Sequence, residues 1–169
     1  MPIAISLLLA CLLAACMSHP RQAAAGTTFI VVRHAEKAKD DPRDPALAET
    51  GRARADALAA SLAHTPLVAA YATVFRRTQQ TAAPSARAHG LAVNSYDAKA
   101  PAADFAAQLK RTHPAGTVLV VGHSNTVPDI AAALCSCEVP RMDDTEYGRR
   151  MTIRIAPDGA ASLTITRDR

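Results

Sequence analysis

Two runs rich in β-branched residues, 27–32 and 116–121, carry apolar side chains on successive positions instead of alternating them with polar ones. Such runs are typical of strands that are buried on both faces, as in a parallel sheet. Weaker strand patterns occupy 68–73 and 91–96. We therefore expect several strands of one central sheet, of which the first two named are the most deeply buried.

Segments with helical spacing separate these strands. They cover 49–64, 76–89, 102–111 and a last stretch that ends near 134. Pro84 is expected to kink the second helix, and Gly90 is expected to end it. A side chain from Ser124 or Asn125 is expected to cap the fourth helix.

The chain closes with two alternating segments, 151–156 and 161–167, around Pro157-Asp158-Gly159, which predicts a β-hairpin. Strands and helices alternate through the rest of the chain. The prediction is therefore an α/β fold, a three-layer αβα sandwich with a mostly parallel central sheet and a C-terminal β-hairpin. A length of 169 residues suits a single domain.

The first residues have the pattern of an export signal. Residues 3–15 form an apolar run that is too short to span a membrane as a mature helix and fits the hydrophobic part of a signal peptide. The run ends in Leu13-Ala14-Ala15-Cys16, which resembles the bacterial lipobox, where the cysteine is lipidated and becomes the mature N-terminus.

We accordingly expect a signal peptide with lipobox over 1–16, a tether over 17–26 and the folded domain over 27–169. Lipid on Cys16 would hold the protein in the cell envelope, in the periplasm, without a spanning helix. The alternative is an ordinary signal peptide that releases a soluble secreted protein.

Composition narrows the choice of partners. Lys and Arg number 19 against 15 Asp and Glu, so the formal charge is +4, which suits an anionic ligand. Nucleic acid is not expected, because no basic stretch is interleaved with aromatic residues. Cys135 and Cys137, separated by one serine, either pair in an oxidising compartment or have an incidental structural role, and they lack the further ligands that a metal site needs.

Residues that can bind an anion or take part in catalysis follow three of the expected strands. Arg33 and His34 come after the first strand, Arg77 opens the helix after the second, and His123 follows 116–121. Ligands in α/β folds bind beyond the carboxyl ends of the strands, so we expect all four side chains in one crevice.

Two guanidinium groups and two imidazoles repel one another unless an anion lies between them. The fork of arginine donors matches the oxygens of a phosphate group, and a neutral imidazole can attack phosphorus. The residues therefore predict a phosphate pocket that contains a nucleophile.

The same residues stand in motifs that resemble the histidine phosphatase superfamily, in its phosphoglycerate-mutase-like branch 1. Val32-Arg33-His34-Ala35-Glu36-Lys37 resembles its RHG/RHA signature. Three further segments resemble motifs of this family. In chain order they are Leu47 with Gly51, then Thr73 with Arg77, Thr78 and Thr81, and finally Val121-Gly122-His123-Ser124. Thr73 replaces the usual serine. Order and spacing agree from about residue 27 to residue 134.

The resemblance implies a phosphoglycerate-mutase-like fold and a phosphomonoesterase that works through a phosphohistidine on His34. Arg33, Arg77 and His123 would hold the phosphoryl oxygens. No metal or other cofactor is implied, because the arginines supply the positive charge. The proton donor of the family has no clear match, and Asp97 and Glu146 are the candidates.

The expected partner is a phosphorylated substrate, either a small molecule, a component of the envelope or a phosphoprotein. Contact with the membrane is expected through the N-terminal lipid only. The alternative function is that of a catalytically silent lipoprotein that binds phosphorylated ligands without turning them over.

Overall fold

The computed structural model describes residues 26–167. The expected signal peptide, its lipobox with Cys16 and all of the tether except Gly26 lie outside the described residues. Within the described range, no helix combines the length and the apolar character that crossing a membrane requires.

The described residues form a six-stranded sheet with the order β3-β2-β4-β1-β5-β6. Its strands are β1 (Thr27–Arg33), β2 (Leu67–Ala72), β3 (Val93–Ser95), β4 (Gly116–Gly122), β5 (Arg149–Ile155) and β6 (Ala161–Arg167). The first four strands run parallel, β5 pairs antiparallel with β1, and β6 pairs antiparallel with β5. The mostly parallel sheet and the C-terminal hairpin are as predicted.

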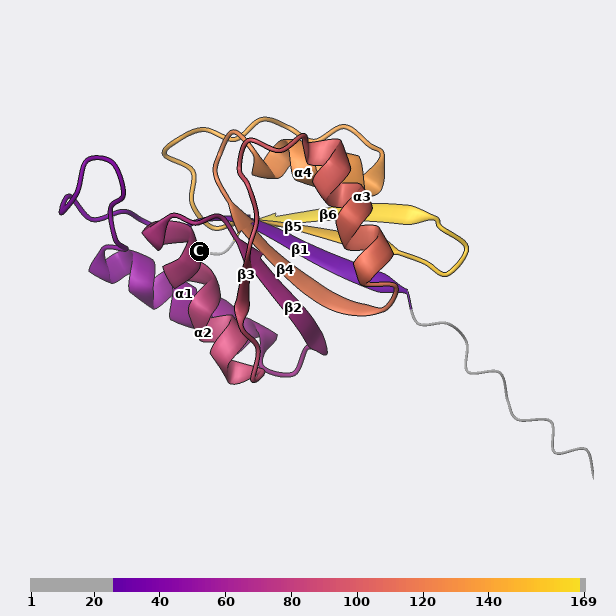
Figure 1. The fold of residues 1–169 in the computed structure, drawn as a ribbon, viewed down its shortest axis with the longest axis horizontal. Coiled ribbons are helices and arrows are strands. Elements are labelled where there is room, and N and C mark those ends of the chain that lie inside the picture. Colours follow the sequence, from indigo (N-terminus) through magenta and orange to yellow (C-terminus); the bar gives the residue numbers. More distant parts are fainter. Residues whose placement is uncertain (1–25, 168–169) are drawn as a thin grey trace, which may run out of the picture.

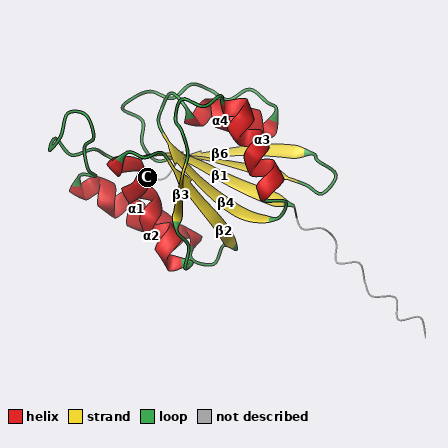
Figure 2. Ribbon diagram, in the orientation of Figure 1, coloured by secondary structure: helices red, strands yellow, loops and turns green. Residues whose placement is uncertain are grey.

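Helices cover both faces of the sheet. They are α1 (Glu49–Leu62), α2 (Arg76–Ala88), α3 (Ala102–Thr112) and α4 (Val127–Cys135). Figure 1 shows α1 and α2 on one face and α3 and α4 on the other, and Figure 2 shows the strands as the middle layer. The predicted three-layer αβα sandwich is confirmed.

The two central strands bury alternate side chains in two separate cores. Phe29 and Val31 of β1 pack with the residues of α3 and α4, whereas Ile30 and Val32 pack with those of α1 and α2. Both faces of β1 are therefore apolar, which explains why this run shows no polar alternation. Full burial of one such side chain contributes about 1.5–3 kcal/mol to folding.

The end of α2 and the start of α4 test the predictions made for these helices. The α2 helix continues through Pro84, and Gly90 follows its end with a φ of 67°, the left-handed conformation that glycine adopts readily. The predicted cap of α4 is wrong: the helix begins after Thr126 without a side-chain cap. Ser124 cannot serve there because its hydroxyl donates to the carboxylate of Asp144 on a later loop.

A disulfide joins Cys135 to Cys137 at the end of α4. Ser136 between them has a φ of 54° and reverses the chain after the helix. The sequence left open whether these two cysteines pair, and in the structure they form a disulfide.

Candidate active site

The carboxyl ends of three parallel strands meet at one edge of the sheet. Arg33, the last residue of β1, pairs in register with Gly122, and Ala72 of β2 pairs with Val121 of β4. The residues that follow these ends surround a cavity of about 370 Å³. Arg33, His34, Arg77 and His123 all line it, so the structure brings the four predicted side chains together.

His34 is held as a neutral imidazole. Its side chain is buried, and its Nδ1 lies 2.8 Å from the carbonyl oxygen of Ala35, so the ring hydrogen is assigned to Nδ1. Burial lowers the pKa of His34 to about 3, against the opposing hydrogen bond to Ala35, and the nearby charge of Arg33 adds to the decrease. The ring therefore carries a lone pair on Nε2 at neutral pH, which is the form that attacks phosphorus.

His123 stands beside His34, with 5.5 Å between the ring centroids. Its Nε2 lies 3.0 Å from Thr73 Oγ1. The hydroxyl of Thr78 lies 2.8 Å from Thr73 Oγ1, so a chain of polar contacts links Thr78, Thr73 and His123. Burial, then Arg77 and Arg33, lower the pKa of His123 to about 4.

Arg33 is fixed in the floor of the cavity. Its Nη1 donates to the carbonyl oxygens of Asp143 at 3.2 Å and Glu146 at 3.0 Å, and its guanidinium carbon lies 4.4 Å from the centroid of the Tyr147 ring. The Nε of Arg33 is buried and has no hydrogen-bond partner among the described residues.

Arg77 shows the same pattern. Its guanidinium carbon lies 4.5 Å above the centroid of the Phe75 ring, and its Nη1 lies 3.7 Å from the carboxylate of Asp44. Nε and Nη1 of Arg77 are buried without a hydrogen-bond partner in the described part of the chain. Burial lowers the pKa of Arg77, and Asp44 opposes that shift, yet a guanidinium remains charged in proteins.

Two close contacts tie the helices to the segment that follows β1. Thr81 of α2 accepts a hydrogen bond from the backbone of Ala35 at 3.0 Å and donates to the carbonyl of Arg77 at 2.7 Å. On α1, a Cβ on Gly51 would lie 2.3 Å from the carbonyl oxygen of Glu36. Both contacts fix the segment that follows His34, which gives a structural reason for the residues of those motifs.

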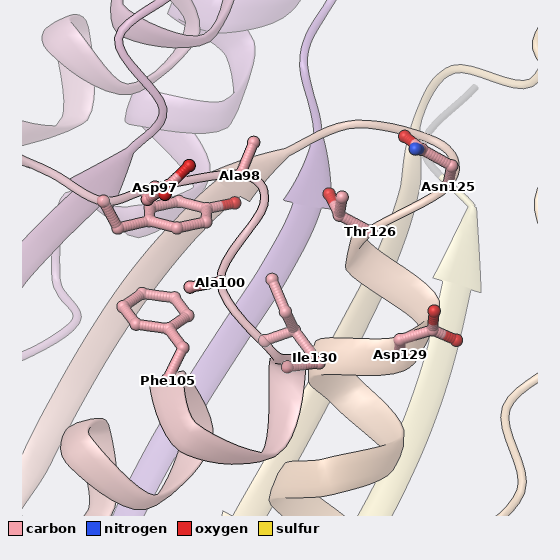
Figure 3. A pocket seen from close by; sticks show the side chains of 10 residues that line it. Asp97, Ala98, Ala100, Phe105, Asn125, Thr126, Asp129 and Ile130 are labelled. Carbon is pink, nitrogen blue, oxygen red and sulfur yellow. The ribbon is translucent and has the colours of Figure 1, made fainter.

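The two candidates for the proton donor lie away from the cavity lining. Glu146 accepts hydrogen bonds from Arg149 and from Arg167, which together lower the pKa of its carboxyl group. Asp97 is exposed and borders a neighbouring hollow of about 140 Å³, together with Phe105 (Figure 3). Neither residue is among those that line the cavity around His34.

Sequence reasoning missed three side chains that shape the site. Phe75 and Tyr147 stack against the two arginines, and the carboxylate of Asp144 lines the cavity. Phe75 stands two positions before Arg77 and could have been noticed. Tyr147 and Asp144 lie in a loop far along the chain, with no motif around them. Residues 26–167 contain no cluster of three or more His, Cys, Asp or Glu that could hold a metal ion.

Comparisons with known proteins give a match to one family model and several solved structures. Residues 29–100 match the family model of the histidine phosphatase superfamily (branch 1). No curated protein sequence matches the chain significantly.

Several solved structures share the fold. The protein histidine phosphatase SixA complexed with tungstate is 19% identical, with a TM-score of 0.66 over 83% of this chain and 96% of that one. A mycobacterial glucosyl-3-phosphoglycerate phosphatase is 16% identical, with a TM-score of 0.67 over 85% and 100%. A phosphoserine phosphatase from Entamoeba histolytica, complexed with 3-phosphoglyceric acid, is 14% identical, with a TM-score of 0.64 over 85% and 98%. At these identities the likeness establishes the fold.

Proposed function

We propose that this chain, whose place in branch 1 of the histidine phosphatase superfamily is supported by the family model and the solved structures, is a phosphomonoester hydrolase. One observation carries the proposal. A buried neutral imidazole, His34, lines one cavity together with the side chains of Arg33, Arg77 and His123. A tetrahedral anion in this cavity can accept hydrogen bonds from the guanidinium groups, and the imidazole supplies the nucleophile.

The reaction has two halves. Nε2 of His34 attacks phosphorus while the bond to the leaving oxygen breaks, which leaves a phosphohistidine. Arg33, Arg77 and His123 hold the equatorial oxygens and stabilise the charge that develops on them. Water then attacks the phosphohistidine, releases inorganic phosphate and restores the neutral imidazole. We propose no metal in this cycle, because the two guanidinium groups supply the positive charge.

The proposed substrate class is a phosphorylated small molecule, an envelope component or a phosphoprotein. The named activities of the similar structures, on a phosphorylated protein histidine, a glucosyl-3-phosphoglycerate and a phosphoserine, have only the phosphoryl group in common. This agrees with a site in which the residues that we assign to catalysis all surround that group.

The test is hydrolysis of p-nitrophenyl phosphate by the purified chain in the presence of a chelator. We expect the wild type to hydrolyse this substrate and vanadate to inhibit the reaction. We expect no turnover by His34→Gln. His113→Gln is the matched control, because His113 lies at the end of α3 and contacts Tyr71. Turnover that requires added metal, or that survives in His34→Gln, contradicts the proposal.

The proposed location is the cell envelope, with lipid on Cys16. Two observations support it: the Leu-Ala-Ala-Cys sequence at 13–16, and the disulfide between Cys135 and Cys137, since disulfides persist in oxidising compartments. Cys16→Ser is expected to move the protein from the membrane fraction to the soluble fraction of cells, whereas the control Cys11→Ser is expected to leave it on the membrane. Membrane retention of the Cys16 variant argues against lipidation.

A further inference from the structure

The loop before β5 is fastened to the floor of the cavity. Nη1 of Arg33 donates to the carbonyl oxygens of Asp143 and Glu146, on either side of Asp144. Arg149 forms an ion pair with the Glu146 carboxylate and donates to the carbonyl of Pro140. Arg33, which lines the cavity, therefore also fixes the backbone on both sides of Asp144.

The side chain of Asp144 lies at the mouth of the cavity. Its Oδ1 accepts a hydrogen bond from the hydroxyl of Ser124 and lies 3.9 Å from Nη2 of Arg33. Ser124 is buried and directly follows His123, so it holds the carboxylate next to the catalytic residues. The Asp144 side chain is 88% exposed, which leaves its second oxygen within reach of water and of a substrate.

Other acidic side chains near the site have different partners. Glu146 binds Arg149 and Arg167, and Glu36 binds Arg54 with an Nη2–Oε1 distance of 2.7 Å. Asp97 borders the neighbouring hollow (Figure 3). Among the described residues, Asp144 is the acidic residue that lines the cavity itself.

The proposed reaction needs a group that exchanges protons. A leaving alkoxide requires a proton, and the water that attacks the phosphohistidine must lose one. His34 cannot do this, because it is bonded to phosphorus in the intermediate. We assign His123 to the phosphoryl oxygens, and its Nε2 contacts Thr73 Oγ1 at 3.0 Å.

We propose that Asp144 is the proton-transfer residue of this site, an inference that rests on the proposed function. In the first half, the bond from phosphorus to Nε2 forms, the bond to the leaving oxygen breaks, and the Asp144 carboxyl gives its proton to that oxygen. In the second half, the carboxylate takes a proton from water as the water oxygen bonds to phosphorus and the bond to Nε2 breaks. Asp144 is then protonated again.

The experiment compares two substrates whose leaving groups differ in their need for a proton. Nitrophenolate leaves without a proton, whereas the alkoxide of glycerol phosphate needs one. In the full purified chain, we expect Asp144→Asn to slow turnover of glycerol phosphate about 100-fold. With p-nitrophenyl phosphate, the first equivalent of nitrophenol is released at the wild-type rate and steady turnover then slows, because the phosphohistidine is hydrolysed slowly. The matched control is Asp56→Asn, the same change on an exposed position of α1.

Several results overturn the inference. They are wild-type rates of Asp144→Asn on both substrates, an equal loss on both without a burst of nitrophenol, and a selective loss of glycerol phosphate turnover in Asp97→Asn. A wild-type chain that hydrolyses neither substrate overturns the proposed function and this inference with it. An active wild type with an unaffected Asp144→Asn variant overturns the inference alone.

Discussion

Arg76 and Arg77 are neighbours in the sequence but have different surroundings. The Arg76 side chain is 48% exposed and forms an ion pair with Asp40 at 3.2 Å, whereas that of Arg77 is 14% exposed and stacks on Phe75. A charged hydrogen bond contributes about 1.5–3 kcal/mol, so its loss lowers the rate by about tenfold or more.

We therefore expect Arg77→Ala to lower kcat/KM for p-nitrophenyl phosphate at least about tenfold. Arg76→Ala is expected to change it less than about twofold, because an exposed ion pair contributes little. Steady-state kinetics of the two variants measure the contrast. Equal losses in both would mean that Arg77 has no special role in binding the anion.

The two buried histidines also predict how stability depends on pH. Their pKa values in the folded chain are about 3 for His34 and about 4 for His123, against 6.5 for an exposed imidazole. Below pH 6.5 the unfolded chain binds protons that the folded chain excludes, so the free energy of unfolding decreases as the pH falls from 6.5 toward 4. Above pH 6.5 both states are neutral and the contribution vanishes.

Urea denaturation at a series of pH values tests this expectation. His34→Gln is expected to show a shallower decrease of the unfolding free energy over that window than the wild type. Parallel curves for the two proteins would show that His34 titrates normally in the folded chain.

Which site residues the sequence could predict depends on where they lie in the chain. Arg33, His34, Arg77 and His123 follow strand ends, and parallel strands bring such positions to one edge. The partners of Arg33 were not predictable in this way, because the carbonyl of Asp143 stands 110 positions away on a loop without regular structure. Asp144 and Tyr147 belong to the same loop, so only the folded chain identifies them.

Among the elements, the predicted strands and helices agree with the structure to within a few residues. The β1 and β4 runs were clear because both faces of each strand are buried. The start of α4 was predicted too early, since the sequence could not reveal that Ser124 binds Asp144 rather than a backbone N–H of the helix.

The contact between α1 and the segment after β1 gives a prediction at this scale. Gly51→Ala would place a Cβ 2.3 Å from the carbonyl oxygen of Glu36, so the helix or the segment must move. We expect a loss of about 1–3 kcal/mol in the free energy of unfolding, together with reduced turnover because His34 shifts.

Ala53→Ser, on an exposed position of the same helix, is the control and is expected to change stability by about 0.5 kcal/mol or less. Chemical denaturation and turnover of p-nitrophenyl phosphate are the two measurements. A fully stable and active Gly51→Ala variant would show that the close approach has no functional role.

The whole molecule places its chemistry at one edge of a rigid sheet. Two cores hold α1 and α2 against one face and α3 and α4 against the other, so the strand ends between them keep their relative positions (Figure 1). The net charge of +4 did not by itself locate an anion site, since exposed and buried cations count equally in it. The folded chain separates them, with Arg33 and Arg77 turned into one cavity.

The central claim is that His34 carries the phosphoryl group during turnover. It is tested by mixing the purified chain with a radiolabelled phosphomonoester, quenching in base, and locating the label in peptides by mass spectrometry. We predict label on His34 that is stable in base and lost in acid, and none in His34→Gln. Label on another residue, or turnover of the wild type with no labelled intermediate under rapid quenching, would contradict the account.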